Sequence, residues 1–161
     1  DRHELDSPAR PPSRWTLALL GAYALVQLAV PLRPWFYPGN PYWTEDGHRF
    51  SWHMMMRSKQ GSIWFRVVDR TTGESRRVYP QRMLTPWQVK AMRGKPDMML
   101  SFAHYLARRH RERTGHRASV HAHAKLRFNG REPANFVAPQ TDLTQYERSL
   151  ASPEWVLPAP D

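Results

Sequence analysis

The pattern of apolar residues divides the chain into a continuous hydrophobic segment and a longer region in which apolar and polar residues are interspersed. From Trp15 to Leu32 the run WTLALLGAYALVQLAVPL contains no Asp, Glu, Lys, Arg or His, and Arg14 and Arg33 flank it. Eighteen helical residues at about 1.5 Å each span about 27 Å, close to the roughly 30 Å hydrocarbon core of a bilayer. This pattern predicts a transmembrane helix over residues 15–32.

Two other structures fit the same apolar run. One is a secretory signal peptide, but no small-x-small cleavage pattern follows, because the run leads into Pro-Leu-Arg-Pro-Trp. The other is a buried core helix, for which an uncharged run of this length is long. Trp15 before the run, and Trp35 and Tyr37 after it, are placed like the aromatic residues of membrane interfaces, which favours the membrane helix.

Further along, the apolar spacing becomes typical of strands. Residues 62–69 (SIWFRVVD) are rich in β-branched and aromatic side chains, which favours a strand. The Thr-Thr-Gly sequence at 71–73 predicts a turn, and residues 74–79 return as a partner strand. Together these segments predict a β-hairpin.

Start and stop signals then indicate two helices. Residues 85–88 (TPWQ) combine a capping threonine, proline at the first helical position and glutamine at the third, which predicts a helix to about Met92. A second helix begins at Pro96, carries apolar residues at helical spacing, and ends at Gly115.

Strict alternation marks one more strand. Over residues 120–128 one face takes Val120, Ala122, Ala124, Leu126 and Phe128, and the other takes His121, His123, Lys125 and Arg127. Asn129-Gly130 predicts a tight hairpin turn. The return strand near 134–137 follows Pro133 and should therefore lie at an edge. The expected fold class is α+β: one transmembrane helix, then antiparallel hairpins with two helices.

Charge and composition add a partner class. The chain has 24 Lys and Arg against 14 Asp and Glu, a net charge of +10. The first fourteen residues and the apolar run are each neutral overall, so the excess lies in residues 33–161. A basic domain indicates anionic partners, among which lipid headgroups and acidic peptides rank above nucleic acid, since no nucleic-acid motif occurs. The absence of cysteine excludes disulfides and thiolate metal sites.

Several short motifs occur in a fixed order along the chain. They are Tyr42-Trp43-Thr44, Phe50-Ser51-Trp52-x-Met54-Met55, Asp69-x-x-Thr72-Gly73-Glu74, Asp97-Met98, Phe102-Ala103-x-Tyr105-Leu106, Leu126-x-x-Asn129-Gly130-Arg131, Asp142-Leu143 and Trp155-x-x-Pro158. In order and spacing they resemble the C-terminal part of the vitamin K-dependent γ-glutamyl carboxylase family, including its bacterial homologues. The resemblance covers the last transmembrane helix and the lumenal or periplasmic domain.

The resemblance implies a multi-helix membrane enzyme of the lyase class. Such an enzyme couples epoxidation of a reduced vitamin K-type quinone to proton abstraction from peptide glutamate, and then adds carbon dioxide. The family's lysine base and quinone pocket belong to earlier helices outside these 161 residues. We therefore expect no catalytic residue and no cofactor bound by this chain, although the reduced quinone is implied for the full-length enzyme.

One family stretch, Tyr-x-x-Trp-Thr followed by Tyr-Ser-Trp, is associated with handling the glutamate substrate. By position the resemblance implies five substrate-binding residues: Trp43, Thr44, His48, Ser51 and Trp52. His48 and Phe50 stand where the vertebrate pattern has tyrosines, and there is no cysteine for the disulfide that joins the vertebrate halves. The alternative role for the tryptophans and His48 is interfacial anchoring and loop packing.

Two further clusters have simpler explanations than chemistry. His121 and His123 share a strand face and could ligate a metal, but no third ligand has matching spacing and Lys125 would repel a cation. We therefore predict a solvated polar face and no metal site. The basic run at 108–113 is interpreted as a solvated helix end, with lipid headgroups as the next alternative.

The sequence thus predicts a flank at 1–14, a transmembrane helix at 15–32 and an extracytoplasmic domain at 33–161. Arg10 and Arg14 place the N-terminus in the cytoplasm and the domain in the periplasm or lumen. The predicted function is to hold a glutamate-containing peptide and to cap the remaining transmembrane helices of a γ-carboxylase-like protein. The alternative is a non-catalytic accessory subunit of a larger membrane complex. Further hydrophobic helices encoded upstream of Asp1 would favour the enzyme.

Overall fold

The computed structural model describes residues 11–32, 43, 58–149 and 153–159. Helix α1 (Arg14–Leu32) matches the predicted apolar helix and has no buried residue. Within the described ranges it is the one helix long and apolar enough to cross a membrane. A signal sequence near an N-terminus passes the same test of length and composition.

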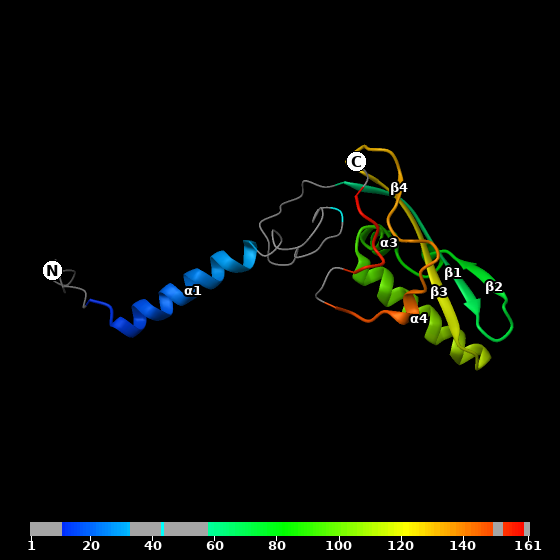
Figure 1. The fold of residues 1–161 in the computed structure, drawn as a ribbon, viewed down its shortest axis with the longest axis horizontal. Helices are drawn as coiled ribbons and strands as arrows, with labels where there is room; N and C mark the ends of the chain where they lie inside the picture. Colours follow the sequence, from blue (N-terminus) through cyan, green and yellow to red (C-terminus); the bar gives the residue numbers. More distant parts are fainter. Residues whose placement is uncertain (1–10, 33–42, 44–57, 150–152, 160–161) are drawn as a thin grey trace, which may run out of the picture.

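The remaining described residues form a four-stranded antiparallel sheet with helices on one side (Figure 1). Its strands are β1 (Lys59–Asp69), β2 (Ser75–Val78), β3 (Ala118–Phe128) and β4 (Ala134–Asn135), in the order β2-β1-β3-β4. Strands β1 and β3 pair over all eleven residues of each. The α+β fold class predicted from the sequence is confirmed.

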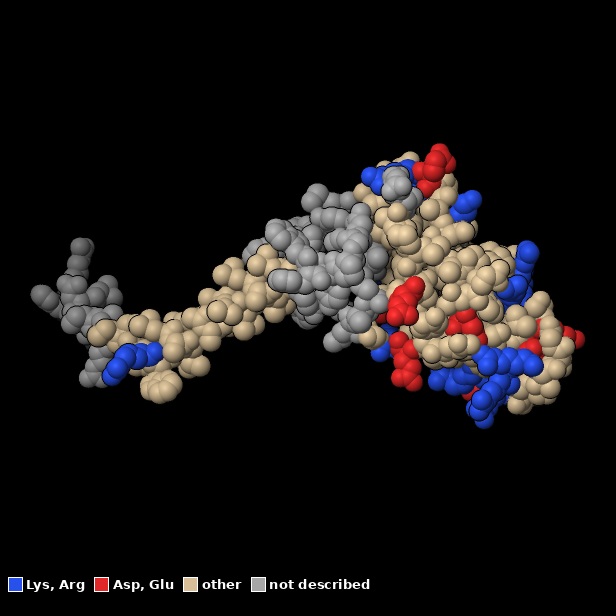
Figure 2. Space-filling view, in the orientation of Figure 1, with Lys and Arg blue, Asp and Glu red and all other residues tan. Residues whose placement is uncertain are grey.

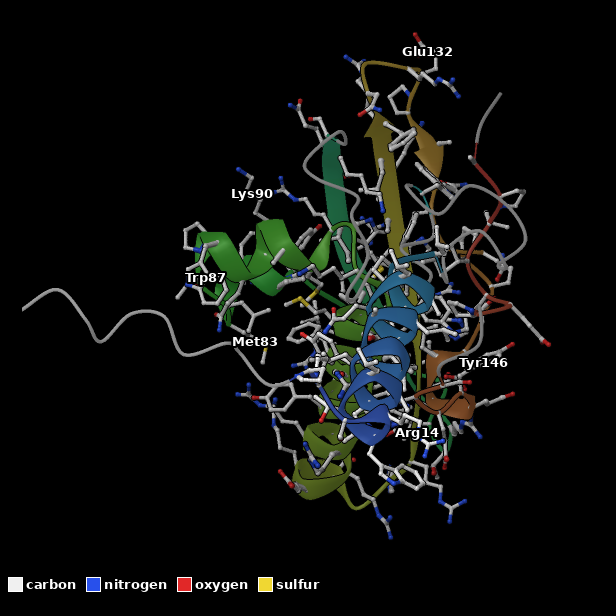
Figure 3. All side chains as sticks on the ribbon, turned by 90° about the vertical axis from the view of Figure 1, so that its left-hand side faces the viewer. Arg14, Met83, Trp87, Lys90, Glu132 and Tyr146 are labelled. Carbon is white, nitrogen blue, oxygen red and sulfur yellow. The ribbon has the colours of Figure 1, made fainter. Side chains whose placement is uncertain are left out.

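Both helices of the domain follow their sequence signals. Helix α3 (Pro86–Met92) has the predicted capping box, in which the Gln88 side chain accepts a hydrogen bond from Thr85 N–H. Its exposed face carries Trp87 and Lys90, which point away from the domain (Figure 3). Helix α4 (Pro96–Thr114) ends as expected at Gly115, which is left-handed with φ +77°.

The core lies between α4 and one face of the sheet. The alternation predicted for β3 is confirmed, because its apolar positions from Val120 to Phe128 are all buried. Their partners from α4 are Met99, Leu100, Phe102, Ala103 and Leu106. This packing fixes the C-terminal half of α4 near the end of the sheet that carries β2.

The turn after β3 differs in part from its prediction. Asn129 and Gly130 take positive φ values of +47° and +82°, and Arg131 N–H donates to Phe128 O, so the tight turn is confirmed. The return strand, however, is only two residues long and starts at Ala134. Pro133 has no N–H to continue the ladder, and the main partner of β3 is β1, far away in sequence.

Candidate functional site

A cleft of about 840 Å³ lies between β2 and the C-terminal half of α4. Its walls come from the end of β1, the β1–β2 turn, β2, the 3-10 helix η2 (Pro80–Arg82) and the last turns of α4. Figure 2 shows Lys and Arg side chains gathered over the end of the domain where α4 finishes. The shape and charge of this cleft make it the best candidate for a binding site.

The rim of the cleft is basic. It is lined by five exposed arginines: Arg76, Arg77, Arg82, Arg109 and Arg113. Two of these arginines are held in place: Arg82 lies 5.8 Å from the centre of the Tyr79 ring, and Arg109 donates to Tyr105 Oη at 3.3 Å. The side chains of Arg76 and Arg113 make no hydrogen bond or ion pair with the part of the chain that the structure describes. Their guanidinium groups are therefore available to a ligand.

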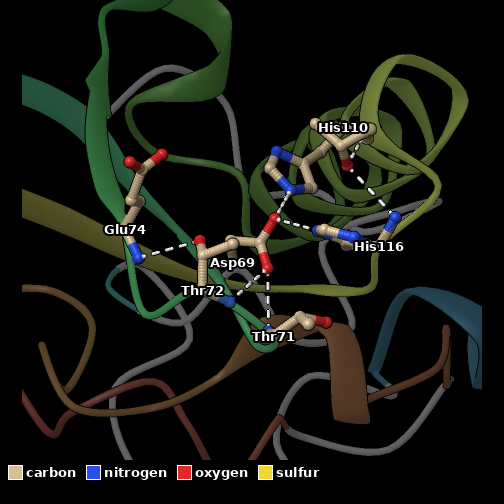
Figure 4. A network of polar contacts seen from close by, with 7 residues as sticks. Asp69, Thr71, Thr72, Glu74, His110 and His116 are labelled. Atoms are coloured by element: carbon tan, nitrogen blue, oxygen red, sulfur yellow. Dashed lines mark hydrogen bonds and ion pairs between the residues drawn. The ribbon is translucent and has the colours of Figure 1, made fainter.

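The floor of the cleft is a buried carboxylate, Asp69, at the end of β1 (Figure 4). Its Oδ1 accepts from the backbone N–H groups of Thr71 at 2.8 Å and Thr72 at 3.0 Å, as in an Asx turn. Its Oδ2 lies 2.8 Å from His110 Nε2 and 3.0 Å from His116 Nδ1. The network joins the β1–β2 turn to the end of α4.

This network keeps Asp69 ionised. Burial raises the pKa of the carboxyl group, but hydrogen bonds from Thr72 N–H, His110, Thr71 N–H and His116 outweigh it and hold the pKa far below its ordinary value. Because the carboxylate accepts, each bonded imidazole nitrogen carries the proton. Asp69 has four donors already, so it is a structural anion and is not free to act as a base.

Trp43 is the one predicted substrate-binding residue within the described ranges; Thr44, His48, Ser51 and Trp52 lie outside them. Its side chain is 0% exposed, donates from Nε1 to Leu157 O at 2.7 Å, and meets Phe128 and Phe136 edge to face. This environment is the packing role that the sequence left open. Substrate contact for all five residues stays a prediction.

The structure does not bring Trp43 and the cleft together. Lys59, which donates to Trp43 O at 2.6 Å, begins β1, and Asp69 ends it. Ten steps of strand at about 3.3 Å each separate the two ends by about 33 Å.

His121 and His123 lie on the polar face of β3, as predicted, but both are half-buried rather than solvated. The His123 ring stacks on Trp64 with centroids 3.8 Å apart and planes 2° apart. Burial, together with the nearby charges of Arg66, His121 and Arg77, lowers the pKa of His123. No group of three or more His, Asp or Glu in the described ranges is arranged to hold a metal.

Sequence reasoning missed the cleft, although parts of it were visible. The sequence placed Asp69 only at the end of a predicted strand and in a family motif, and His110 only inside the basic run at 108–113. The available signal was periodicity, because Arg109, His110 and Arg113 share one helix face with Leu106.

Within the described residues, an apolar helix of spanning length precedes a small basic α+β domain, an arrangement typical of membrane-anchored domains. A family model for the lumenal domain of vitamin K-dependent gamma-carboxylase matches residues 12–161, and the chain belongs to that family. Comparisons with curated proteins and with solved structures gave no match.

Proposed function

We propose that this chain is the C-terminal extracytoplasmic portion of a γ-carboxylase-like integral membrane protein, where it binds the peptide substrate and caps the transmembrane catalytic part. The family supplies the carboxylase-like lumenal context. The observation that supports peptide binding is the basic cleft between β2 and α4. A peptide rich in glutamate is complementary to it in charge.

The charges of the cleft favour carboxylates as ligands. The charge of Asp69 is already compensated by its four donors, which leaves Glu74 as the other acid in the lining. Arg76 and Arg113 offer planar guanidinium groups, which bind carboxylates through two parallel hydrogen bonds. The Asp69 network holds α4 against the β1–β2 turn, so the two sides of the cleft are positioned before the ligand arrives.

The proposed role is binding rather than catalysis. The cleft is open and its rim is basic, and we assign no quinone chemistry to it. That the chain binds no quinone stays a prediction.

A long peptide could use both ends of the domain. If the segment around Trp43 also contacts substrate, as the resemblance implies, the peptide must cover the length of β1, about 33 Å or ten extended residues. In that arrangement the cleft binds acidic residues of the peptide, far from the glutamate of the same peptide that receives carbon dioxide.

The test is peptide binding to the full chain in neutral detergent, measured by fluorescence anisotropy. A glutamate-rich peptide should bind, and the same peptide with glutamine should bind at least about tenfold more weakly. Arg76→Glu with Arg113→Glu should abolish the difference. Lys125→Glu with Arg127→Glu is the matched control, since it changes the net charge equally at exposed sites outside the cleft lining.

Two results would defeat the proposal. One is equal affinity for the two peptides. The other is an equal loss in both double variants, because net charge alone would then explain binding. The accessory-subunit alternative predicts that the polypeptide carrying this domain has no further hydrophobic helices, so the mass of that polypeptide purified from membranes separates the two.

The proposed topology can be tested in the same protein. Because the chain has no cysteine, Ser13→Cys before α1 and Ser101→Cys on α4 each give a unique thiol. In sealed cells or spheroplasts an impermeant maleimide should label position 101 and leave position 13 unlabelled. The opposite pattern would reverse the proposed orientation.

A further inference from the structure

The second charged surface of the domain is the side of the sheet that faces away from α3 and α4 (Figure 1). We call it the outer sheet face; it consists of Gln60, Ser62, Trp64, Arg66, Val68, Ser75, Arg77, Ser119, His121, His123, Lys125, Arg127 and Asn135. It contains four Arg or Lys, two His and no acidic residue. Ser75 and Arg77 also line the cleft, whereas Arg76 and Arg113 do not belong to the outer sheet face.

Strand register sets like charges side by side on this face. Arg66 on β1 is directly opposite Arg77 on β2. Directly opposed like charges are unfavourable in a sheet, and no carboxylate of the outer sheet face offsets them. Such an arrangement is stabilised when an anion binds.

An aromatic stack also holds Arg77 and His123 in position. Arg77 lies 4.8 Å from the centre of the Trp64 ring, and His123 covers a Trp64 face at 3.8 Å. Arg66 Nε, His121 Nδ1 and His123 Nε2 are buried atoms without a hydrogen-bond partner in the described chain. Lys125 and Arg127 continue the basic face along β3 and are exposed.

From this geometry we propose that the outer sheet face docks on anionic lipid headgroups of the membrane that holds α1. The proposal rests on α1 as a membrane anchor and is independent of peptide binding in the cleft. The charges spread along two eleven-residue strands instead of converging on a cavity, which suits a surface of many phosphates. The anchor keeps the domain at a high effective concentration near the bilayer.

The contribution of single charges to docking can be expressed as the ratio of docked to undocked domains. Each Lys or Arg close to an anionic leaflet changes the equilibrium by about fivefold. Removing the two exposed charges at Lys125 and Arg127 should therefore reduce the docked fraction relative to the undocked one by about 25-fold or more.

The experiment uses the full chain in nanodiscs of phosphatidylcholine, with or without phosphatidylglycerol. A fluorophore on Ser62→Cys, an exposed outer-face position, reports contact through a quencher attached to lipid headgroups. The same label on Ser101→Cys, on the exposed side of α4, is the control. Quenching at position 62 should need phosphatidylglycerol, weaken with salt, and exceed quenching at position 101.

Charge variants separate this proposal from the previous one. Lys125→Glu with Arg127→Glu should abolish quenching at position 62 and keep peptide binding. Arg76→Glu with Arg113→Glu should do the reverse. Equal quenching in the neutral and anionic discs, equal quenching at positions 62 and 101, or an equal loss in both variants would each overturn docking through this face. None of these results would affect the peptide-binding proposal.

Discussion

Trp43 connects three parts of the domain that are distant in sequence, and its removal should be costly. The indole is fully buried, and its N–H bonds to Leu157 O across 114 residues. Its ring meets Phe128 at the end of β3 and Phe136 just after β4. We predict that Trp43→Ala destabilises the domain strongly, whether or not Trp43 touches a substrate.

The expected magnitude follows from burial. Truncating a buried aromatic side chain to alanine costs about 3–5 kcal/mol, which includes the lost edge-to-face contacts. For a domain of this size 1 kcal/mol corresponds to about 4 °C in melting temperature, so Trp43→Ala should lower it by about 12–20 °C. Trp43→Phe keeps a ring but leaves Leu157 O without its donor, and should cost about 1–3 kcal/mol.

The assay is thermal unfolding of the full chain in detergent, followed by near-UV circular dichroism. Trp87→Ala is the matched control, because Trp87 is 68% exposed on α3 and its truncation should change stability by less than about 0.5 kcal/mol. If Trp43→Ala were as mild as Trp87→Ala, the described packing of residue 43 would be wrong. A normal melting temperature with lost peptide binding would instead assign Trp43 to substrate contact.

Three further predictions concern single positions. Gly61→Ala should destabilise the sheet by several kcal/mol, because the added Cβ would lie 2.0 Å from Lys125 O. Gly73→Ala has open space around the added Cβ and should cost about 1 kcal/mol through backbone strain alone. Thermal melts of the two variants test this difference. Because the pKa of Asp69 is lowered by folding, its contribution is complete above its ordinary pKa near 3.8 and is lost as the pH falls below it. Asp69→Asn should therefore reduce the drop in melting temperature between about pH 5 and about pH 2.5, and an unchanged drop would contradict this. His121→Ala should scarcely change the melting temperature, and zinc should not raise that of the native protein; a marked rise with zinc would reopen the metal interpretation.

The elements that the sequence predicted well are those encoded by neighbouring residues. The capping box at Thr85 and Gln88, the stop at Gly115 and the alternation along β3 need no knowledge of the rest of the chain. The pairing of β1 with β3 was not predicted, since its register depends on contacts between residues 59–69 and 118–128. Periodicity gives the face of a strand, but it does not identify the neighbour.

The floor of the cleft was hidden for the same reason. Asp69 and its two histidines are 41 and 47 residues apart, and no local pattern joins them. Each has an ordinary local role: Asp69 forms an Asx turn, His110 lies in the last turns of α4, and His116 follows its left-handed cap. Only the packing of α4 on the sheet brings the three side chains together.

The spacing of the basic residues at the end of α4 contained a signal for part of the cleft lining. Met99, Phe102, Ala103 and Leu106 are buried at steps of three, one and three residues, and the same steps continue to Arg109, His110 and Arg113. Arg108 and Arg111 of the same run are exposed and do not line the cleft. One helical stripe therefore changes from apolar to basic where the four-residue strand β2 leaves the helix only partly covered. Two of the four arginines of the run, Arg109 and Arg113, are therefore in phase with the core-facing residues, and the other two are not. The phase of Arg109 and Arg113 was thus the local signal that pointed to the cleft, while Arg108 and Arg111 fit the predicted solvated helix end.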